Sequence, residues 1–214
     1  MLIDASIIKS LLDTYGISIR GILHVGAHEC EEMTVYKGWG VDPANIVWVD
    51  ANPGLVEKNT RTGIPNCYTA ALDEVARETT FNITNNGQSS SLLEFGTHAQ
   101  SYPWCVVTDT LRVTTEKLSD FYRSRSLDSA KYNVWNFDIQ GSEFSVFRGS
   151  KELLRGVDCV YTEVNTAEVY KGCGLLHMID DLLKEYGLVR VMLEMTECGW
   201  GDALYLRHNL SSEI

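Results

Sequence analysis

The stretch GILHVGAHECEEM, residues 21–33, decides the fold class of this chain of 214 residues. Its apolar residues run into a Gly26-Ala27 step, and two histidines and a cluster of acids follow. This order is typical of a buried strand, a tight turn and a helix, which we place at residues 21–25 and 30–39. The acids also have a simpler explanation, because acidic side chains stabilise the N-terminal turn of any helix.

The rest of the chain continues this alternation of strand and helix. β-rich runs predict strands at residues 45–50, 66–72, 79–84, 132–139, 156–164, 187–195 and 202–208. Helices are predicted at residues 4–15, from Pro53 behind an Asn52 cap, at 114–122 behind Thr114 or Thr115, at 142–154 and at 175–186. The alternation predicts a doubly wound α/β fold whose last two strands are antiparallel neighbours.

Composition narrows the class of protein. The net charge is −11 without any run of Lys or Arg, which disfavours a nucleic-acid partner because such binders need clustered cations. The six cysteines include no C-x-x-C pair, the first residues lack the apolar core of a signal peptide, and no apolar run reaches membrane-spanning length. We therefore expect a soluble, cytoplasmic protein with reduced thiols and no membrane partner. It would be a single domain over residues 1–214, with an N-terminal helix in residues 1–18 and the catalytic core in residues 19–208.

Chemically reactive residues follow several of the predicted strands. His24 and Gly26 end the first strand, Asp50 ends the second, and Asp138 and Glu163 end two later ones. In a doubly wound sheet, ligands bind outside the carboxyl ends of the strands. The sequence therefore predicts a ligand site at that edge of the sheet.

The spacing of Gly26 and Asp50 indicates the kind of ligand. Gly26 lets a ligand approach the backbone, and Asp50, 24 positions later, can accept the protons of both ribose hydroxyls of a nucleoside. The dinucleotide fingerprint G-x-G-x-x-G is absent, and Glu29, Glu31 and Glu32 would repel a pyrophosphate. A nucleoside that carries positive charge fits better than NAD. S-adenosylmethionine, with a sulfonium and an ammonium group, is such a nucleoside.

With these motifs the chain resembles the FkbM-type family of S-adenosylmethionine-dependent methyltransferases. ILHVGAHECEE is similar to the first motif of the family, VWVDANPGLVEKN to its second, and NNGQSSSLLEFG to its serine-bearing loop. The most specific piece is DIQGSEFSVFRGS, residues 138–150, and the likeness runs from about residue 19 to residue 207. The resemblance implies the class I methyltransferase fold, a Rossmann-like, seven-stranded and mostly parallel sheet with an antiparallel final strand.

The resemblance also implies roles for individual residues. Asp50 would hold the ribose, Glu29 or Glu32 would face the ammonium group, and Asp138 would lie beside the methyl donor. His24 stands where the family often has Asp, which could alter how the methionine part is held. The whole implied cofactor-binding set is His24, Gly26, Ala27, Glu29, Glu32, Asp50, Ala51, Asn52, Ala71, Ser90, Ser91 and Asp138. The implied reaction is methylation of a hydroxyl of a sugar or another natural product.

A sugar hydroxyl is a weak acid, so its methylation needs a base or a metal ion. The candidate catalytic residues are Asp138, Glu163 and His98. Asp138, Glu163 and Asn165 also offer the oxygen ligands that suit Mg²⁺ or Mn²⁺, although Glu163 could equally form a plain hydrogen bond to the substrate. Loop residues are candidates to contact the acceptor, with ordinary packing as the alternative for each ring: Tyr102, Trp104, Tyr170, His177 and Trp200.

The leading hypothesis is therefore an O-methyltransferase that acts on a hydroxyl of a small molecule or glycan. A methyltransferase of another small-molecule hydroxyl or of an amine is the nearest alternative, although no N-P-P-Y-like segment is present to hold an amino nitrogen. A nucleoside-binding module without catalytic activity is the third. The retention of both Asp50 and Asp138 argues for an enzyme.

Overall fold

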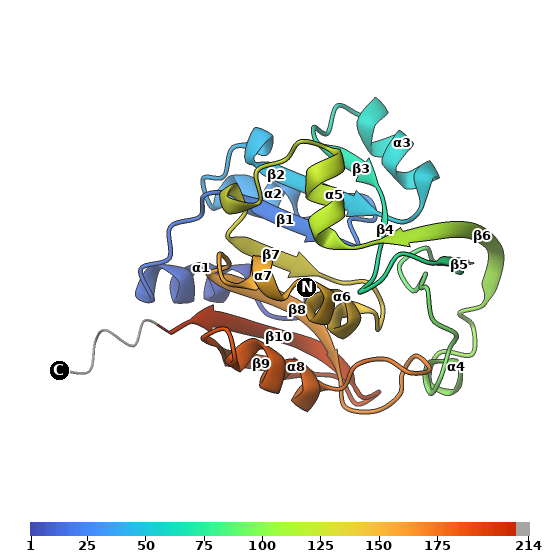
Figure 1. Ribbon diagram of the computed structural model, residues 1–214. Coiled ribbons are helices and arrows are strands. Elements are labelled where there is room, and N and C mark those ends of the chain that lie inside the picture. Colours follow the sequence, from blue (N-terminus) through green and yellow to red (C-terminus); the bar gives the residue numbers. More distant parts are fainter. Residues whose placement is uncertain (209–214) are drawn as a thin grey trace.

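The computed structural model describes residues 1–208, which are built around a central seven-stranded sheet (Figure 1). The strand order is β3-β2-β1-β7-β8-β10-β9. All neighbouring strands are parallel except β10, which runs antiparallel to both β8 and β9. The predicted mostly parallel sheet with an antiparallel final strand is confirmed. The bounds of the strands are β1 Ile22–Val25, β2 Ile46–Asp50, β3 Cys67–Thr69, β7 Val134–Phe137, β8 Cys159–Asn165, β9 Leu188–Met195 and β10 Trp200–Arg207.

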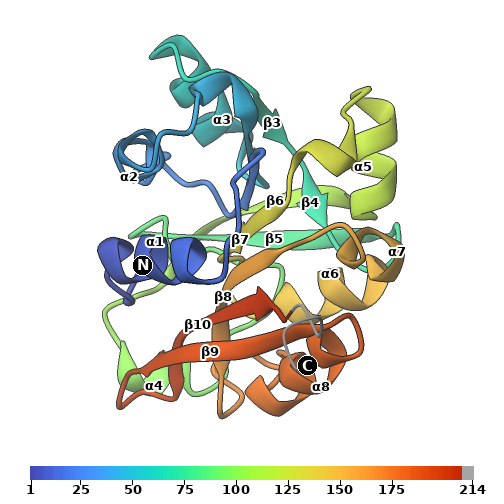
Figure 2. The same cartoon turned by 90° about the vertical axis from the view of Figure 1, so that its left-hand side faces the viewer.

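Helices cover both faces of this sheet, because its central strands are buried on both sides. On one face α1 (Ala5–Thr14) and α2 (Met33–Gly38) pack on a cluster that includes Ile22 and Trp48. On the other, α5 (Leu118–Ser124), α6 (Glu143–Gly149), α7 (Lys151–Leu154) and α8 (Leu176–Lys184) pack on a cluster that includes Phe121, Phe147 and Leu183 (Figure 2). Within residues 1–208 no helix is both long and apolar enough to cross a bilayer. The remaining helices are α3 Pro53–Arg61, α4 His98–Ser101, η1 Pro43–Asn45 and η2 Ser129–Lys131.

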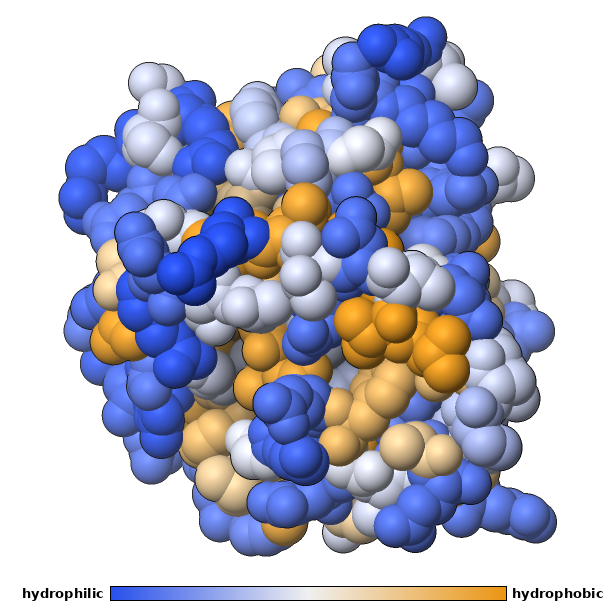
Figure 3. All heavy atoms as spheres, turned by 90° about the vertical axis from the view of Figure 1, so that its right-hand side faces the viewer, coloured by the Kyte–Doolittle hydropathy of each residue, from blue (hydrophilic) through white to orange (hydrophobic). Residues whose placement is uncertain are grey.

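A second sheet of three strands extends from the main one. It contains β4 (Ala71–Leu72), β5 (Glu78–Thr84) and β6 (Val107–Glu116) in the order β4-β6-β5. The predicted single strand at residues 66–72 is therefore divided between two sheets. The face of the molecule at the right of Figure 1, where β6 runs, has apolar side chains near its middle and hydrophilic ones around them (Figure 3).

The prediction of a helix at residues 114–122 is wrong in its first half. Thr114 and Thr115 belong to β6, and the helix α5 begins only at Leu118. The hydroxyl of Thr115 does not cap a helix, because it donates to the backbone oxygen of Val75 at 2.7 Å. The segment of residues 107–116 is rich in β-branched residues, and its less exposed Leu111, Val113 and Thr115 alternate with polar neighbours, which suits a strand that is exposed on one face.

The turn after β1 is longer than predicted. Helix α2 begins at Met33 rather than at Cys30, because His28 and Cys30 both adopt left-handed backbone conformations, with φ of 42° and 57°. Residues 26–32 therefore form an irregular loop at the carboxyl edge of the sheet. This loop brings its backbone and several side chains to the edge where a ligand is expected.

Candidate active site

Two cavities open at the carboxyl edge of the main sheet. The first is a narrow slot between the ends of β1 and β2 and residues of β4 and β5. The second has a volume of about 500 Å³ and reaches from the turn after β1 to β8 and β10. Gly26, His28, Gln88 and Asp138 line both. The two cavities therefore meet at the ends of β1 and β7.

Gly26 occupies the point of closest approach between these two strand ends. Its φ is +86°, and a Cβ atom at this position would lie 1.7 Å from the backbone oxygen of Asp138. The backbone N–H groups of Gly26 and Ala27 both donate to the backbone oxygen of Val49, at 2.9 and 3.0 Å. Only glycine fits here, because any side chain would push β1 and β7 apart. The turn thus ties three strand ends together and leaves its surface open to a ligand.

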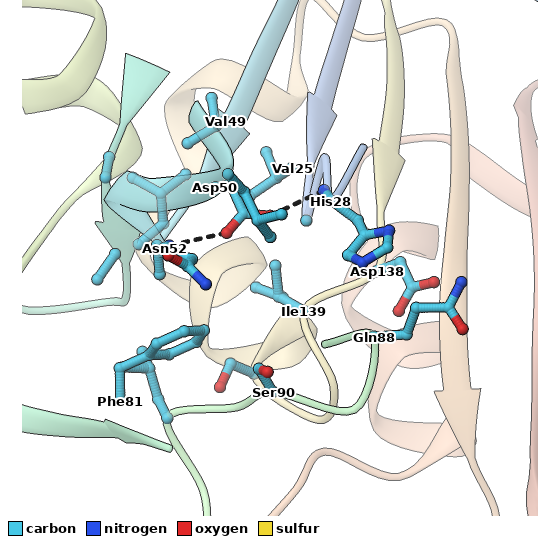
Figure 4. A pocket seen from close by; sticks show the side chains of 18 of the residues that line it. Val25, His28, Val49, Asp50, Asn52, Phe81, Gln88, Ser90, Asp138 and Ile139 are labelled. Atoms are coloured by element: carbon cyan, nitrogen blue, oxygen red, sulfur yellow. Dashed lines mark hydrogen bonds between the residues drawn. The ribbon is translucent and has the colours of Figure 1, made fainter. Parts of the chain in front are cut away.

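Asp50 is held at the floor of the slot, where its carboxylate is 9% exposed. Its two oxygens accept hydrogen bonds from the backbone N–H groups of His28 and Asn52, both at 2.8 Å (Figure 4). Each carboxylate oxygen can accept a second hydrogen bond, so the pair remains able to bind two ribose hydroxyls. Burial raises the pKa of Asp50, although these two backbone donors oppose the shift.

Apolar side chains form the walls of the slot. Val49, Leu72, Phe81 and Ile139 lie around the space beside Asp50, from both sheets and from the loop after β7 (Figure 4). Such walls suit the faces of a planar base, and Asp50 supplies the polar end. The residues of the predicted cofactor set that line the slot are Gly26, Asp50, Ala51, Asn52, Ala71, Ser90 and Asp138. These residues match the polarity of a nucleoside, with a carboxylate at one end and apolar walls beside it.

The two predicted loop serines lie in different environments. Ser90 lines the slot, where its hydroxyl donates to the backbone oxygen of Gly87 at 2.7 Å. Ser91 is 1% exposed and lines neither cavity; its hydroxyl donates to the backbone oxygen of Gln140 at 2.8 Å. Ser91 therefore braces the loop after β7, and Ser90 is the serine that a ligand in the slot would meet.

The predicted cofactor residues in and near the turn after β1 also lie in different environments. Glu29 is exposed and forms an ion pair with Lys58 at 2.6 Å, outside both cavities. Ala27 is buried in the core under the turn. Glu32 and His24 line the second cavity. Burial raises the pKa of Glu32 and lowers the pKa of His24 to about 3, so that the histidine ring is neutral, with its Nδ1 3.0 Å from the hydroxyl of Tyr36.

Gln140 links the acids at the ends of β7 and β8. Its side-chain nitrogen donates to Asp138 at 2.5 Å and to Glu163 at 2.6 Å, and its side-chain oxygen accepts from the hydroxyl of Tyr170. The residue has a left-handed backbone, with φ of 56°. Burial raises the pKa of Asp138 to about 6, with Asp202 adding to the shift, and raises the pKa of Glu163 well above its ordinary value.

This arrangement does not fit a metal ion at the predicted ligands. The amide nitrogen of Gln140 lies where Asp138 and Glu163 would share a cation, and it presents hydrogen atoms to both. The amide nitrogen of Asn165 is 3.4 Å from Glu163, so this residue also turns a donor toward the carboxylate. In the described part of the chain, no group of three or more His, Cys, Asp or Glu side chains could hold a metal ion. The metal role of these residues stays a prediction, and no chemical step is derived through it.

Aromatic side chains form the outer wall of the second cavity. The predicted acceptor residues Tyr102, Trp104, Tyr170 and Trp200 all line it, and the indole nitrogen of Trp200 donates to the Tyr102 hydroxyl at 2.9 Å. The fifth, His177, lies on the exposed side of α8 and lines neither cavity.

His98 lines the second cavity although it is only 5% exposed. Its ring stacks on Phe95 with 4.3 Å between the centroids, and its Nδ1 has no hydrogen-bond partner among residues 1–208. Burial lowers the pKa of His98, so the ring is neutral near pH 7. A buried neutral imidazole is able to accept a proton from a bound molecule.

Several lining residues were not singled out in the sequence. Asp202, on β10, lines the second cavity between Tyr161 and Glu163, and Gln88 lies at the junction of the two cavities (Figure 4). Asp202 stands in the segment GWGDALYLR, and its two-residue spacing from Trp200 places both side chains on the same face of a strand. That spacing is the signal that could have identified it. Gln140 stands within DIQGSE, where only its acidic neighbours were considered.

Comparisons with known proteins identify the family. The sequence matches the Methyltransferase FkbM domain over residues 24–189. It is 34% identical over 101 residues to the 2-O-methyltransferase NoeI of Sinorhizobium fredii, a match that covers 47% of this chain and 41% of that protein. The matched segment is thus less than half of the length of that relative.

Solved structures of methyltransferases align with this chain at low sequence identity. One is the magnesium protoporphyrin IX methyltransferase of Synechocystis with bound SAM, with a TM-score of 0.45 and 9% identity over 95% of this chain and 78% of that chain. Another is an S-adenosylmethionine-dependent methyltransferase from Clostridium acetobutylicum, with a TM-score of 0.45 and 7% identity over 96% of this chain and 91% of that one.

The family match extends over most of the chain and includes the turn after β1, Asp50, both serines and the strand ends at Asp138 and Glu163. It therefore covers the slot and most of the second cavity. The chain belongs to the FkbM methyltransferase family, and its main sheet has the seven-stranded, mostly parallel arrangement with an antiparallel β10 that this family resemblance implies.

Proposed function

We propose that this methyltransferase acts on a hydroxyl group of a sugar or glycan. The observation that carries the proposal is the junction of the two cavities at Gly26 and Asp138. A nucleoside-sized slot opens there into a larger cavity with aromatic walls, which is the arrangement that a methyl donor and a sugar acceptor need. The similarity to NoeI, a 2-O-methyltransferase, supports the same reaction type.

In the slot, Asp50 would accept hydrogen bonds from the ribose, and the apolar walls would hold the adenine. Ala51, Asn52 and Ala71 complete the nucleoside side, and Ser90 closes it from the loop above. Glu32, which lines the second cavity, would face the ammonium group, and Asp138, which lines both cavities, would lie beside the methyl group. The bound cofactor supplies a methyl group on a positively charged sulfur, which is already a good leaving group.

In the second cavity, the protein must orient the acceptor and receive its proton. The ring of Trp200 offers a flat apolar surface to a sugar, and the hydrogen bond from Trp200 to Tyr102 fixes its position. As the acceptor oxygen takes up the methyl group, the electrons of the S–C bond would stay on sulfur, and the electrons of the O–H bond would stay on oxygen. The proton passes to Asp138, the carboxylate that lines both cavities in the described chain, while Glu163 and His98 orient the acceptor.

The charge of the second cavity also bears on the acceptor. Its lining carboxylates and the net charge of −11 disfavour a nucleic-acid substrate, because phosphates would be repelled. The proposal uses no metal ion at any step. Activity should therefore survive EDTA.

Calorimetry with S-adenosylhomocysteine tests the nucleoside site. We expect Asp50→Ala to weaken binding at least tenfold, because the ribose loses its carboxylate partner. Asp109→Ala is the matched control, since it removes an exposed carboxylate from β6, and its affinity should equal that of the wild type. Unchanged affinity in Asp50→Ala, or tight binding of NAD without binding of S-adenosylhomocysteine, would overturn the assignment. A methylation assay with monosaccharides against RNA and DNA then tests the acceptor class.

A further inference from the structure

Two buried carboxylates face each other across β8 and β10. Glu163 and Asp202 are directly paired in the antiparallel register, and their side chains are only 4% and 5% exposed. Like charges opposite each other destabilise a sheet, and a buried carboxylate normally requires a positive partner. The pair lies in the floor of the second cavity, where a bound molecule can reach it.

The protein itself supplies this pair with neutral donors only. One oxygen of Asp202 accepts from the Tyr161 hydroxyl and from the backbone N–H of Leu2 at 2.5 Å. One oxygen of Glu163 accepts from Gln140 at 2.6 Å, and the other has only the long contact of 3.4 Å from Asn165.

No positive side chain is close. Within residues 1–208, no ion pair includes Glu163 or Asp202. The lining of the second cavity contains no Lys or Arg in the described chain, although five carboxylates line it: Glu31, Glu32, Asp138, Glu163 and Asp202. The amino group of Met1, which also lines the cavity, opposes the rise in the pKa of Asp138 and of Glu32, but it forms no ion pair with a carboxylate within residues 1–208. The carboxylates of the lining therefore favour a positively charged ligand in this cavity, in addition to the ammonium group of the cofactor.

Two further polar groups in the same region have no partner. The ring of His98, 95% buried on the wall of the cavity, leaves Nδ1 without a hydrogen bond. The side-chain oxygen of Asn165, beside Glu163, is likewise buried and unpaired, but Asn165 lines neither cavity. Buried polar atoms in native proteins are almost always satisfied, so the unpaired Nδ1 of His98, on the cavity wall, indicates a missing ligand with its own hydrogen-bonding groups.

We propose that Glu163 and Asp202 bind a protonated amine of the acceptor, so that the acceptor is an amino sugar or a glycan that contains one. This inference rests on the proposed function and names the acceptor class within it. An alkylammonium group has three N–H donors and suits unpaired carboxylate oxygens. The half-buried ring of Trp200 on the cavity wall also favours an organic cation, because aromatic faces attract ammonium groups and stack on sugars.

A divalent metal fits the same pair less well. Mg²⁺ requires about six oxygen ligands in regular geometry, whereas Gln140 turns N–H groups toward Asp138 and Glu163. An amine carries one charge and needs no such cage. The amine also gives the site selectivity, since N-acetylation removes the charge and a phosphate on the sugar would be repelled.

The experiment measures binding to the full chain saturated with S-adenosylhomocysteine at pH 7. The probes are glucosamine, galactosamine and mannosamine, their parent hexoses, their N-acetyl forms and glucose 6-phosphate, with MgCl₂ alone as a separate titration. We expect at least one amino sugar to bind tenfold or more tightly than its parent hexose and its N-acetyl form. Glucose 6-phosphate should bind more weakly than glucose.

Two variants test whether the preference for an amino sugar depends on the carboxylates of Glu163 and Asp202. Asp202→Asn keeps the shape of the side chain and an acceptor for Tyr161, and should reduce the affinity for that amino sugar at least fivefold without changing the affinity for the parent hexose. Asp109→Asn, which makes the same change of charge on the exposed face of β6, should leave both affinities as in the wild type. Thermal melting of both variants shows that they are folded.

Each outcome has a separate meaning. If no amino sugar is preferred over its parent hexose, or if the preference survives in Asp202→Asn, the amine site is wrong while the methyltransferase assignment stands. If MgCl₂ binds to the wild type and not to Asp202→Asn, while the amino sugars show no preference, the pair is a metal site instead. If the wild type fails to bind S-adenosylhomocysteine, the proposed function itself falls.

Discussion

Gly26→Ala is the most informative perturbation of the proposed site. The substitution places a methyl group 1.7 Å from the backbone oxygen of Asp138 and forces alanine to adopt a φ of +86°. The matched control is Gly63→Ala, because Gly63 has a φ of +88° and no heavy atom within 4 Å of its added Cβ. The two variants share the backbone penalty, and only Gly26→Ala adds the collision.

The size of both effects follows from this geometry. A left-handed alanine costs about 1–2 kcal/mol, which is the whole expected effect of Gly63→Ala. Overpacking typically adds about 1–3 kcal/mol, and a collision with backbone lies at the upper end because neither strand end can rotate away. We expect Gly26→Ala to lose roughly 3–5 kcal/mol of unfolding free energy. For a protein of this size the Tm should fall by roughly 10–15 °C, against roughly 5 °C for the control.

Thermal melting with and without S-adenosylhomocysteine measures both consequences. At a concentration of 100 times Kd, the ligand stabilises a binding-competent chain by about 2.7 kcal/mol, and we expect this shift in the wild type and in Gly63→Ala. Gly26→Ala should show little or no shift, since β1 and β7 must separate at the junction of the cavities. Equal losses of Tm and equal ligand shifts in the two variants would refute the reasoning.

Three further predictions test other parts of the structure. The pKa of His24 is about 3 in the folded chain and about 6.5 in the unfolded chain, so the unfolding free energy should fall as the pH falls from about 6.5 to about 3. His24→Gln should remove roughly 2–3 kcal/mol of the loss of unfolding free energy between pH 7 and pH 4.5, as measured by urea titrations at the two pH values. Phe147→Ala, in a fully buried position against Phe137, should lower the unfolding free energy by about 3–5 kcal/mol in the same assay, and full S-adenosylhomocysteine affinity at 25 °C would show that the site is intact. Trp104→Ala, on the outer wall and 60% exposed, should raise the acceptor KM several-fold at unchanged cofactor affinity; an unchanged KM would remove Trp104 from the acceptor site.

The central strands could be predicted from the sequence because burial on both faces leaves a continuous apolar signal. β1, β2, β7 and β8 are buried along their whole length; Asp50 is the last residue of β2, and Asp138 follows β7. The change from apolar to polar residues marks the ends of these two strands. The two acids that line the slot could therefore be identified from local pattern.

Other features depend on contacts that no local pattern contains. β6 is exposed along much of its length, so its residues carry little apolar signal, and two threonines resemble helix caps. Asp202 meets Glu163 only because β10 inserts between β8 and β9. The position of Gln140 between two acids depends on a left-handed backbone that its sequence does not require.

The order of strands in the main sheet separates the residues of the slot from those of the floor of the second cavity. Groups that would hold the nucleoside come from β1, β2, β4 and β5, whereas the floor of the acceptor cavity comes from β8 and β10 on the opposite side of β7. Substitutions on β10 would therefore change the second cavity and leave the slot as it is. The residues of β8 and β10 that line the second cavity could therefore be exchanged between relatives without a change in the residues of the slot.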